Sequence, residues 1–193
     1  MLDCDLGLAN LDVMLGITPA ANLQDILDGG ATAQDALVSV DALNGQRLDM
    51  IPSSSGGSEP VDFDGEMRAV LLERILPSVT PYDYLLMDLG AGITPTVLSF
   101  AAMSRIRVVV VSPEPTSLTD SYALIKVLAT QYGVQDFYIM VNQAEDEEEE
   151  NLPFERLNAA CEKFLGFPIS FLGGVRYDRA VTDAIRAQQP LLT

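Results

Sequence analysis

Short apolar runs recur along the chain, each bounded by turn-forming residues, and such runs are typical of buried β-strands. They cover residues 48–51, 84–87, 108–111, 137–141 and 169–172. Between these runs, apolar residues spaced by three and four predict helices with one buried face, for example from Met67 to Ile75 and from Leu124 to Leu128. Strands that alternate with helices predict an α/β fold, with a mostly parallel sheet and helices on both of its faces.

Two acidic residues stand close together at the start of the sequence. Side chains alternate between the two faces of a strand, so Asp3 and Asp5 point to one face and Cys4 to the other. Two carboxylates on one face repel each other unless a cation or ordered water lies between them, which favours a divalent metal and an activated water. The same spacing is compatible with two acids that only solvate the end of a strand.

Other polar residues also follow predicted strands. Asp88 comes directly after the 84–87 run and precedes a turn that contains Gly90. An acid at a strand end can hold Mg²⁺ through water, and glycine lets the backbone approach a phosphate, although Asp88 could equally cap a turn. Asn142 ends another strand, where its amide suits the edge of an adenine or forms a turn, and prolines stiffen the loop at Pro113. Ligands of parallel α/β sheets bind at these carboxyl ends of strands.

The composition indicates one domain without a membrane segment. With 193 residues, of which 48% are apolar, the chain can bury a sizeable core, and we expect a single domain over residues 1–193. No apolar stretch approaches the roughly 20 residues of a membrane helix, and no signal-peptide pattern opens the sequence, so we expect a cytoplasmic protein. A net charge of −17 disfavours binding to nucleic acid. The lack of histidine, with isolated cysteines at Cys4 and Cys161, excludes zinc sites and Ser-His-Asp or Cys-His catalysis.

Two local patterns predict the conformation of particular segments. The acidic run at residues 145–150 is a block of like charge, which we expect in a solvated loop before the next helix. Ser117 followed by Asp120 predicts the first turn of a helix, because this spacing is typical of a capping box.

The run from Asp3 to Asp12 resembles the stretch after the second strand of MinD/ParA-type ATPases, and is most similar to their regulators of flagellar number and placement. Four later segments resemble that family in the same order and spacing: residues 82–93, 112–126, 140–142 and 171–190. The resemblance implies a P-loop NTPase fold and a dimer switch that hydrolyses ATP with Mg²⁺. The partners it implies are a second copy of the chain in the ATP-bound state and a flagellar or polar protein.

The resemblance also implies roles for individual residues. Asp3 and Asp88 match positions that hold the magnesium ion and its water shell, and Asp5 matches the catalytic position that orients the attacking water. The positions that contact the nucleotide are matched by Gly90, Pro113 and Asn142.

One motif of the family is not found in these residues: the loop K-G-G-x-G-K-[ST], whose N–H groups and lysine hold the phosphates of ATP. The nearest glycine cluster, residues 53–57, lacks that ending and predicts a turn, with phosphate binding as the less favoured alternative. We therefore expect a core without the family's first strand and loop, either shortened at its amino-terminal end or naturally degenerate, that binds neither ATP nor Mg²⁺ tightly alone. Because that strand is central in the family, its loss predicts a gap, direct pairing of its neighbours, or a borrowed strand.

Further departures from the family bear on function. Gln143 stands where relatives usually carry a basic residue, which weakens the expected adenine contact. The last helical stretch carries only Arg179 and Arg186 as basic residues, so we expect no membrane-targeting helix and no membrane binding. A non-catalytic interaction module with a degenerate nucleotide site is the main alternative function. A phosphoacceptor receiver domain is disfavoured because Lys126 lies within a predicted helix.

Overall fold

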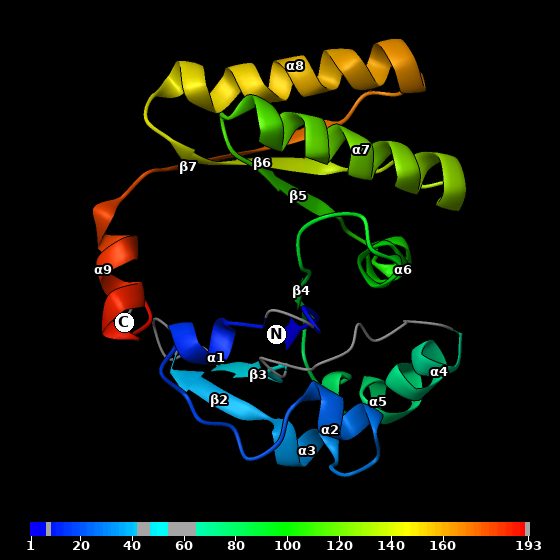
Figure 1. Ribbon diagram of the computed structural model, residues 1–193, viewed down its shortest axis with the longest axis vertical. Helices are drawn as coiled ribbons and strands as arrows, with labels where there is room; N and C mark the ends of the chain where they lie inside the picture. Colours follow the sequence, from blue (N-terminus) through cyan, green and yellow to red (C-terminus); the bar gives the residue numbers. More distant parts are fainter. Residues whose placement is uncertain (7–8, 42–46, 54–64, 192–193) are drawn as a thin grey trace. The chain divides into compact units, whose positions relative to one another are not determined.

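The computed structural model describes residues 1–6, 9–41, 47–53 and 65–191 (Figure 1). The chain divides into two compact units. The first contains residues 1–91, 95–97 and 180–193, and the second contains residues 92–94 and 98–179. The single domain expected over residues 1–193 stays a prediction.

Parallel pairing around a short strand organises the first unit. Strand β1 (Leu2–Asp3) pairs with β4 (Met87–Asp88) in a register that places Asp3 opposite Asp88. On its other side, β1 forms a parallel bridge with Ile51, the residue after β3 (Arg47–Met50). β3 also pairs with β2 (Val38–Asp41), and this pair is antiparallel. β1 is thus hydrogen-bonded to neighbours on both sides.

The helices of the first unit are short. They are α1 (Leu11–Met14), α2 (Leu23–Leu27), α3 (Ala33–Ala36), α4 (Gly65–Arg74), α5 (Leu76–Val79) and nearly all of α9 (Arg179–Ala187). α2 begins with a capping box formed by Asn22 and Asp25, which satisfies backbone N–H groups at the helix start. Arg74 Nη1 donates hydrogen bonds to the carbonyl oxygens of Ile26 (2.7 Å) and Leu27 (3.1 Å), so α4 satisfies the otherwise unpaired carboxyl end of α2.

Aliphatic side chains form the buried core of the first unit. Leu2, Leu23, Ile26, Met50 and Ile51 are each at most 1% exposed. Fully burying a large aliphatic side chain contributes roughly 1.5–3 kcal/mol, so this cluster holds the short β1 against its neighbours.

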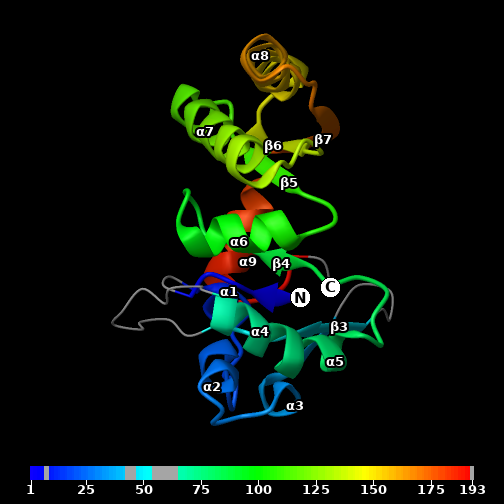
Figure 2. The same cartoon turned by 90° about the vertical axis from the view of Figure 1, so that its right-hand side faces the viewer.

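A three-stranded parallel sheet forms the centre of the second unit. Its order is β5 (Val108–Val111), β6 (Tyr138–Ala144) and β7 (Ser170–Arg176), and α6 (Pro95–Met103) precedes β5. The long helices α7 (Pro115–Tyr132) and α8 (Glu147–Leu165) lie on one face of this sheet (Figures 1 and 2). The parallel pairing confirms the predicted α/β architecture. Helical cover on both faces stays a prediction, because Val108 and Val110 are 43% and 56% exposed while Val109 and Val111 are buried.

Helix α8 corrects one prediction in part, because four residues of the acidic run at 145–150, Glu147 to Glu150, lie in the helix and not in a loop. The helix begins at Glu147, and the Asp146 side chain caps it by accepting a hydrogen bond from the Glu149 N–H (2.9 Å). Acidic side chains stabilise a helix start, since the unpaired N–H groups there carry partial positive charge. A block of like charge is therefore compatible with an ordered helical turn at this position.

The start of α7 is a second correction. The helix begins at Pro115 with Glu114 as its N-cap residue, so Ser117 and Asp120 do not form the predicted capping box. Proline suits the first helical position because its missing N–H would have no partner there. The Ser117 hydroxyl instead accepts a hydrogen bond from the Ser112 N–H (2.9 Å), which closes the loop after β5.

Strand β4 is shorter than predicted. The expected strand covers residues 84–87, but β4 is Met87–Asp88, and the side chains of Tyr84, Leu85 and Leu86 are 88%, 42% and 62% exposed. In the part of the chain that the structure describes, β4 pairs only with β1, and β5 pairs only with β6. Within these residues β4 and β5 are therefore edge strands, and the gap, direct pairing or borrowed strand expected for a core without its central strand stays a prediction.

Candidate functional site

Two adjacent strands of the first unit end in carboxylates. Asp3 is the last residue of β1 and Asp88 the last of β4, and the parallel register places their Cα atoms opposite each other. The backbone fixes this arrangement, because the Asp3 N–H donates to the Ile51 carbonyl (3.0 Å) and the Cys4 N–H donates to the Asp88 carbonyl (2.8 Å). Asp3 is 1% exposed, whereas the side chain of Asp88 is exposed. The sheet thus offers one buried and one accessible carboxylate side by side.

The Asp3 carboxylate is held by the backbone that follows it. Its Oδ1 accepts a hydrogen bond from the Asp5 N–H (3.1 Å), and the Ser53 backbone also hydrogen-bonds to it. Burial raises the pKa of Asp3, these backbone hydrogen bonds oppose that shift, and the nearby charges of Asp88 and Asp5 raise it further. The Asp88 carboxylate is accessible but still partly desolvated at the strand end, which raises its pKa, and the charge of Asp5 adds to that shift. The three carboxylates repel one another, and a bound cation would relieve that repulsion.

The Asp5 carboxylate lies directly against Gly90. A Cβ atom at position 90 would lie 2.9 Å from Asp5 Oδ2 and 3.0 Å from Asp5 Cγ, so a larger residue at position 90 would displace the carboxylate. The turn after β4 therefore approaches Asp5 closely because it carries a glycine. The structure brings together all four predicted residues of the first unit, while their chemical roles stay predictions.

Ser53 is a site residue that the sequence did not reveal. It follows β3 by three positions, and its side chain is 2% exposed. Among the described residues, its Oγ is the buried side-chain polar atom that lacks a hydrogen-bond partner. Buried hydroxyls are normally paired, so this atom marks a position that a water or a ligand oxygen would satisfy. The turn predicted at 53–57 lies outside the described residues from position 54 onward.

Within the residues that the structure describes, no three His, Cys, Asp or Glu side chains are arranged as a metal-binding group. Magnesium sites commonly use one or two carboxylates and complete their coordination with water and phosphate oxygens. The assignment of Asp3 and Asp88 to a metal therefore stays a prediction.

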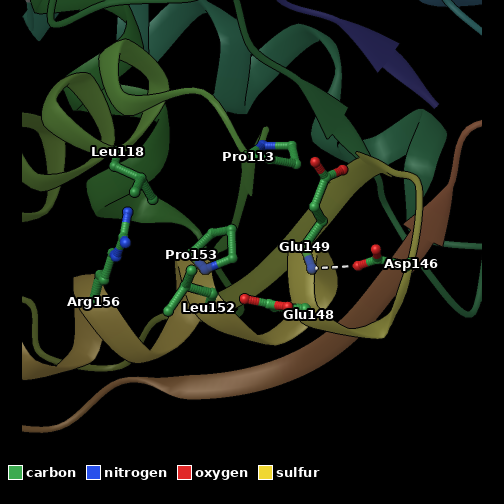
Figure 3. A pocket seen from close by; sticks show the side chains of 8 residues that line it. All are labelled: Pro113, Leu118, Asp146, Glu148, Glu149, Leu152, Pro153 and Arg156. Carbon is green, nitrogen blue, oxygen red and sulfur yellow. Dashed lines mark hydrogen bonds between the residues drawn. The ribbon is translucent and has the colours of Figure 1, made fainter.

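The remaining predicted residues, Asn142 and Pro113, belong to the second unit. Asn142 is half-buried in β6, and its Oδ1 accepts a hydrogen bond from the Gln143 N–H (3.0 Å). Gln143 has a φ of 62°, in the left-handed region, and the register of β6 with β7 shifts between Asn142 and Ala144. Pro113 lines a cavity between α7 and α8 (Figure 3). Nucleotide contact by either residue stays a prediction.

No helix in the described part of the chain combines the length and apolar character needed to cross a bilayer.

Comparison with known proteins then identifies relatives. No protein-family model matches the chain. The antiactivator FleN of Pseudomonas aeruginosa is 34% identical over 189 residues, which span 98% of this chain and 66% of FleN. The flagellum site-determining protein YlxH of Helicobacter pylori is 28% identical over 200 residues, which span 99% of this chain and 63% of YlxH. The septum site-determining protein MinD of Thermotoga maritima is 29% identical over 73% of this chain and 50% of that MinD.

The chain belongs to the MinD/ParA family of ATPases. The predicted similarity to flagellar regulators within this family is confirmed by FleN and YlxH. The chain spans about two thirds of the length of these curated relatives.

Solved structures support the family fold. MinD from the Aquifex aeolicus MinC:MinD complex superposes with a TM-score of 0.73 at 22% identity, over 98% of this chain and 73% of that chain. A ParA family ATPase from Chlorobium tepidum gives a TM-score of 0.71 at 23% identity, over 99% and 76% of the two chains. At these identities the similarity establishes the fold, an α/β arrangement of parallel strands.

Proposed function

We propose that the protein is an ATP-dependent dimer switch of the MinD/ParA type that regulates flagellar number or placement in the cytoplasm. In this proposal, ATP hydrolysis with Mg²⁺ requires a phosphate-binding loop of the kind K-G-G-x-G-K-[ST] together with the residues described above. The observation that supports it most is the 34% identity to FleN over 98% of the chain. It is also supported by the carboxyl ends of β1 and β4, which bring together three carboxylates and a glycine that could hold Mg²⁺ and orient water: Asp3, Asp5, Asp88 and Gly90.

The first unit provides groups that fit a magnesium ion held partly through water. Asp88 would hold that ion from the exposed side and Asp3 from the buried side, since carboxylate oxygens are ligands that Mg²⁺ prefers. The orphaned Ser53 hydroxyl would hydrogen-bond to an oxygen of its water shell. When bound, the ion supplies neutralisation of charge on the transferred phosphoryl group.

Asp5 would orient the attacking water. Its carboxylate lies against Gly90, where the backbone can approach a phosphate without interference from a side chain. An acceptor that aligns a water molecule acts mainly on the transition state, so it affects turnover more than affinity. In the second unit, the Asn142 amide nitrogen would donate to the adenine, because its oxygen already accepts from Gln143, and the rigid Pro113 loop would border the nucleotide.

The alternative is a non-catalytic interaction module of the same fold, with a degenerate nucleotide site. It is favoured by one departure from the family, that Gln143 stands where relatives usually carry a basic residue, which weakens the expected adenine contact. In both proposals the partners are a second copy of the chain and a flagellar or polar protein, and only the first requires ATP to control them.

Calorimetric titration with Mg-ATP distinguishes the two. We expect the 193-residue chain to bind only with a dissociation constant on the order of millimolar, because the loop that would compensate the phosphate charge is absent from it. A longer version that carries K-G-G-x-G-K-T should bind far more tightly and release phosphate. Asp5→Ala in that version should reduce turnover more than ATP affinity. Micromolar binding and phosphate release by the 193-residue chain would overturn this account, and an inactive longer version would favour the interaction module.

A further inference from the structure

A cavity of about 350 Å³ lies between α7 and α8 in the second unit. Four of its lining residues are apolar: Pro113, Leu118, Leu152 and Pro153. Figure 3 shows that they come from the loop after β5, from α7 and from the second turn of α8. This volume is near the lower end of the range for ligand pockets, and it suffices for one large apolar side chain and the stem of a neighbour.

The apolar floor of the cavity is preformed. Pro153 is buried inside α8, where it lacks the N–H that would bond the Glu149 carbonyl, and its ring faces the cavity instead of a neighbouring turn. Pro113 has a fixed φ, and its loop is closed by the hydrogen bond between Ser112 and Ser117. A floor built from two prolines loses little conformational freedom when a partner binds.

One end of the cavity is strongly acidic, where Asp146, Glu148 and Glu149 line it (Figure 3). One oxygen of Asp146 accepts from the Glu149 N–H (2.9 Å), and one oxygen of Glu149 accepts from the Glu145 N–H (3.0 Å). These bonds hold both carboxylates in place, and the second oxygen of each makes no hydrogen bond with a described residue. Glu148 makes no hydrogen bond or ion pair with any described residue.

In the described part of the chain no Lys or Arg forms a salt bridge with Asp146, Glu148 or Glu149, and Arg176 pairs instead with Glu150 (3.9 Å). Arg156 lies at the opposite end of the cavity, beside Leu118 (Figure 3), and it forms no salt bridge with the described part of the chain. The chain as a whole carries a net charge of −17. A cationic group is therefore attracted to the Asp146 end, and an acidic segment is repelled from it.

We propose that this cavity docks a segment of a partner protein in which a Lys or Arg stands next to a large apolar residue. The apolar side chain packs on the floor formed by Pro113, Leu118 and Pro153. The cation lies at the acidic end and pairs with Glu148 and with the second oxygens of Asp146 and Glu149. This docking needs neither ATP nor the carboxylates at the ends of β1 and β4, and it shares only Pro113 with the proposed nucleotide site, so it extends beyond the proposed function.

The test is a selection of short random peptides displayed on phage against the full 193-residue chain. Enriched sequences are synthesised with a fluorescent label, and their affinity is measured by anisotropy. We expect Lys or Arg beside Leu, Ile, Met or Phe in the enriched peptides. Glu148→Arg should weaken their binding by about fivefold, because it converts an attraction into a repulsion at a partly solvated site. Leu118→Asp should weaken it by about tenfold or more, since it places a charge on the apolar floor.

The matched control is Glu155→Arg, which makes the same charge change at an exposed position of α8 that does not line the cavity. Circular dichroism verifies that each variant is folded. The proposal is overturned if no sequence is enriched, if acidic peptides are enriched, or if Glu155→Arg weakens binding as much as Glu148→Arg. A sedimentation coefficient that falls on Glu148→Arg would also overturn it, because a second copy of the chain would then cover this surface.

Discussion

The crossing of α8 over β7 makes a quantitative prediction at Gly174. A Cβ atom at this position would lie 2.1 Å from Glu150 Cγ, 2.3 Å from Cδ and 2.6 Å from Oε1. In Gly174→Ala the Glu150 side chain must therefore move by roughly 1.5 Å to reach an ordinary contact distance of about 3.5–4.0 Å. That movement breaks its ion pair with Arg176 Nε, which is already long at 3.9 Å.

The expected cost follows from three contributions. Overpacking costs about 1–3 kcal/mol, and the lower end applies because the displaced atoms belong to a flexible, partly exposed side chain. Loss of the surface ion pair costs at most about 1 kcal/mol. Replacing glycine by alanine also raises the free energy of unfolding by about 0.5 kcal/mol, because it reduces the entropy of the unfolded chain. Gly174→Ala should thus lower the free energy of unfolding by about 1 kcal/mol.

Removing the Glu150 side chain should turn the destabilising effect of Gly174→Ala into a stabilising one. In a Glu150→Ala background, Gly174→Ala should raise the free energy of unfolding by about 0.5 kcal/mol, which gives a coupling energy of about 1.5 kcal/mol. Urea unfolding of the four proteins, followed by circular dichroism, measures this cycle. Gly30→Ala serves as the control, because the nearest atom to its Cβ would be the Asp25 carbonyl oxygen at 3.6 Å, an ordinary contact. The effects of Gly30→Ala and Glu150→Ala on the free energy of unfolding should be additive. If those of Gly174→Ala and Glu150→Ala are additive as well, residues 150 and 174 are not in close contact.

Three further predictions concern the first unit and α6. Partial burial raises the pKa of Asp88 above its ordinary 3.8, so the folded state binds a proton at Asp88 more tightly than the unfolded state does. The free energy of unfolding therefore includes a favourable contribution from the protonated carboxyl group, and this contribution is lost as the pH rises through the raised pKa. Asp88→Asn should therefore gain stability relative to the unchanged chain as the pH rises above about 4, and urea unfolding that shows no such trend would contradict it. Gly90→Ala, in the longer version with the phosphate-binding loop, should reduce phosphate release by about tenfold or more, because its Cβ displaces the Asp5 carboxylate; unchanged turnover would refute that role. Phe100→Ala should lower the free energy of unfolding by about 3–5 kcal/mol, since Phe100 is fully buried, whereas Tyr84→Ala, at a side chain 88% exposed, should change it by less than about 0.5 kcal/mol.

The pattern of apolar residues correctly predicted the strands β5 and β6 of the second unit. The β-branched run at Val108–Val111 and the apolar run that opens β6 form strands, because each packs under long helices and pairs with an adjacent strand. The run at 84–86 failed for the opposite reason. Its residues are as apolar as those of the others, but the described partner strand β1 has only two residues and pairs with Met87 and Asp88, and pattern alone does not reveal how long a partner strand is. The antiparallel β2 was missed because its alternation covers only four residues.

The candidate site was predictable as far as its residues stand at strand ends. Asp3, Asp5 and Asp88 are recognisable from their positions after apolar runs, and parallel register then brings them together. For Ser53 the sequence favoured a turn over phosphate binding, because Ser- and Gly-rich segments are typical of turns, and its burial without a hydrogen-bond partner is what marks it as a candidate site residue. The docking cavity could not be predicted either, because the acidic run at its end is typical of a loop. In the structure these residues start α8, with Asp146 as the N-cap residue.

The pairing of β1 has a consequence for the order in which the protein folds. Helices α7 and α8 depend on contacts between residues close in sequence and can form early. The N–H groups of Asp3 and Cys4 acquire their hydrogen bonds only when Ile51 and Asp88, both distant in sequence, have been brought to them. Closing such long loops is slow. The carboxylate cluster should therefore be assembled late in folding. In pulsed hydrogen exchange the amides of Asp3 and Cys4 should gain protection after those of α8, and simultaneous protection would show that the site forms with the helices.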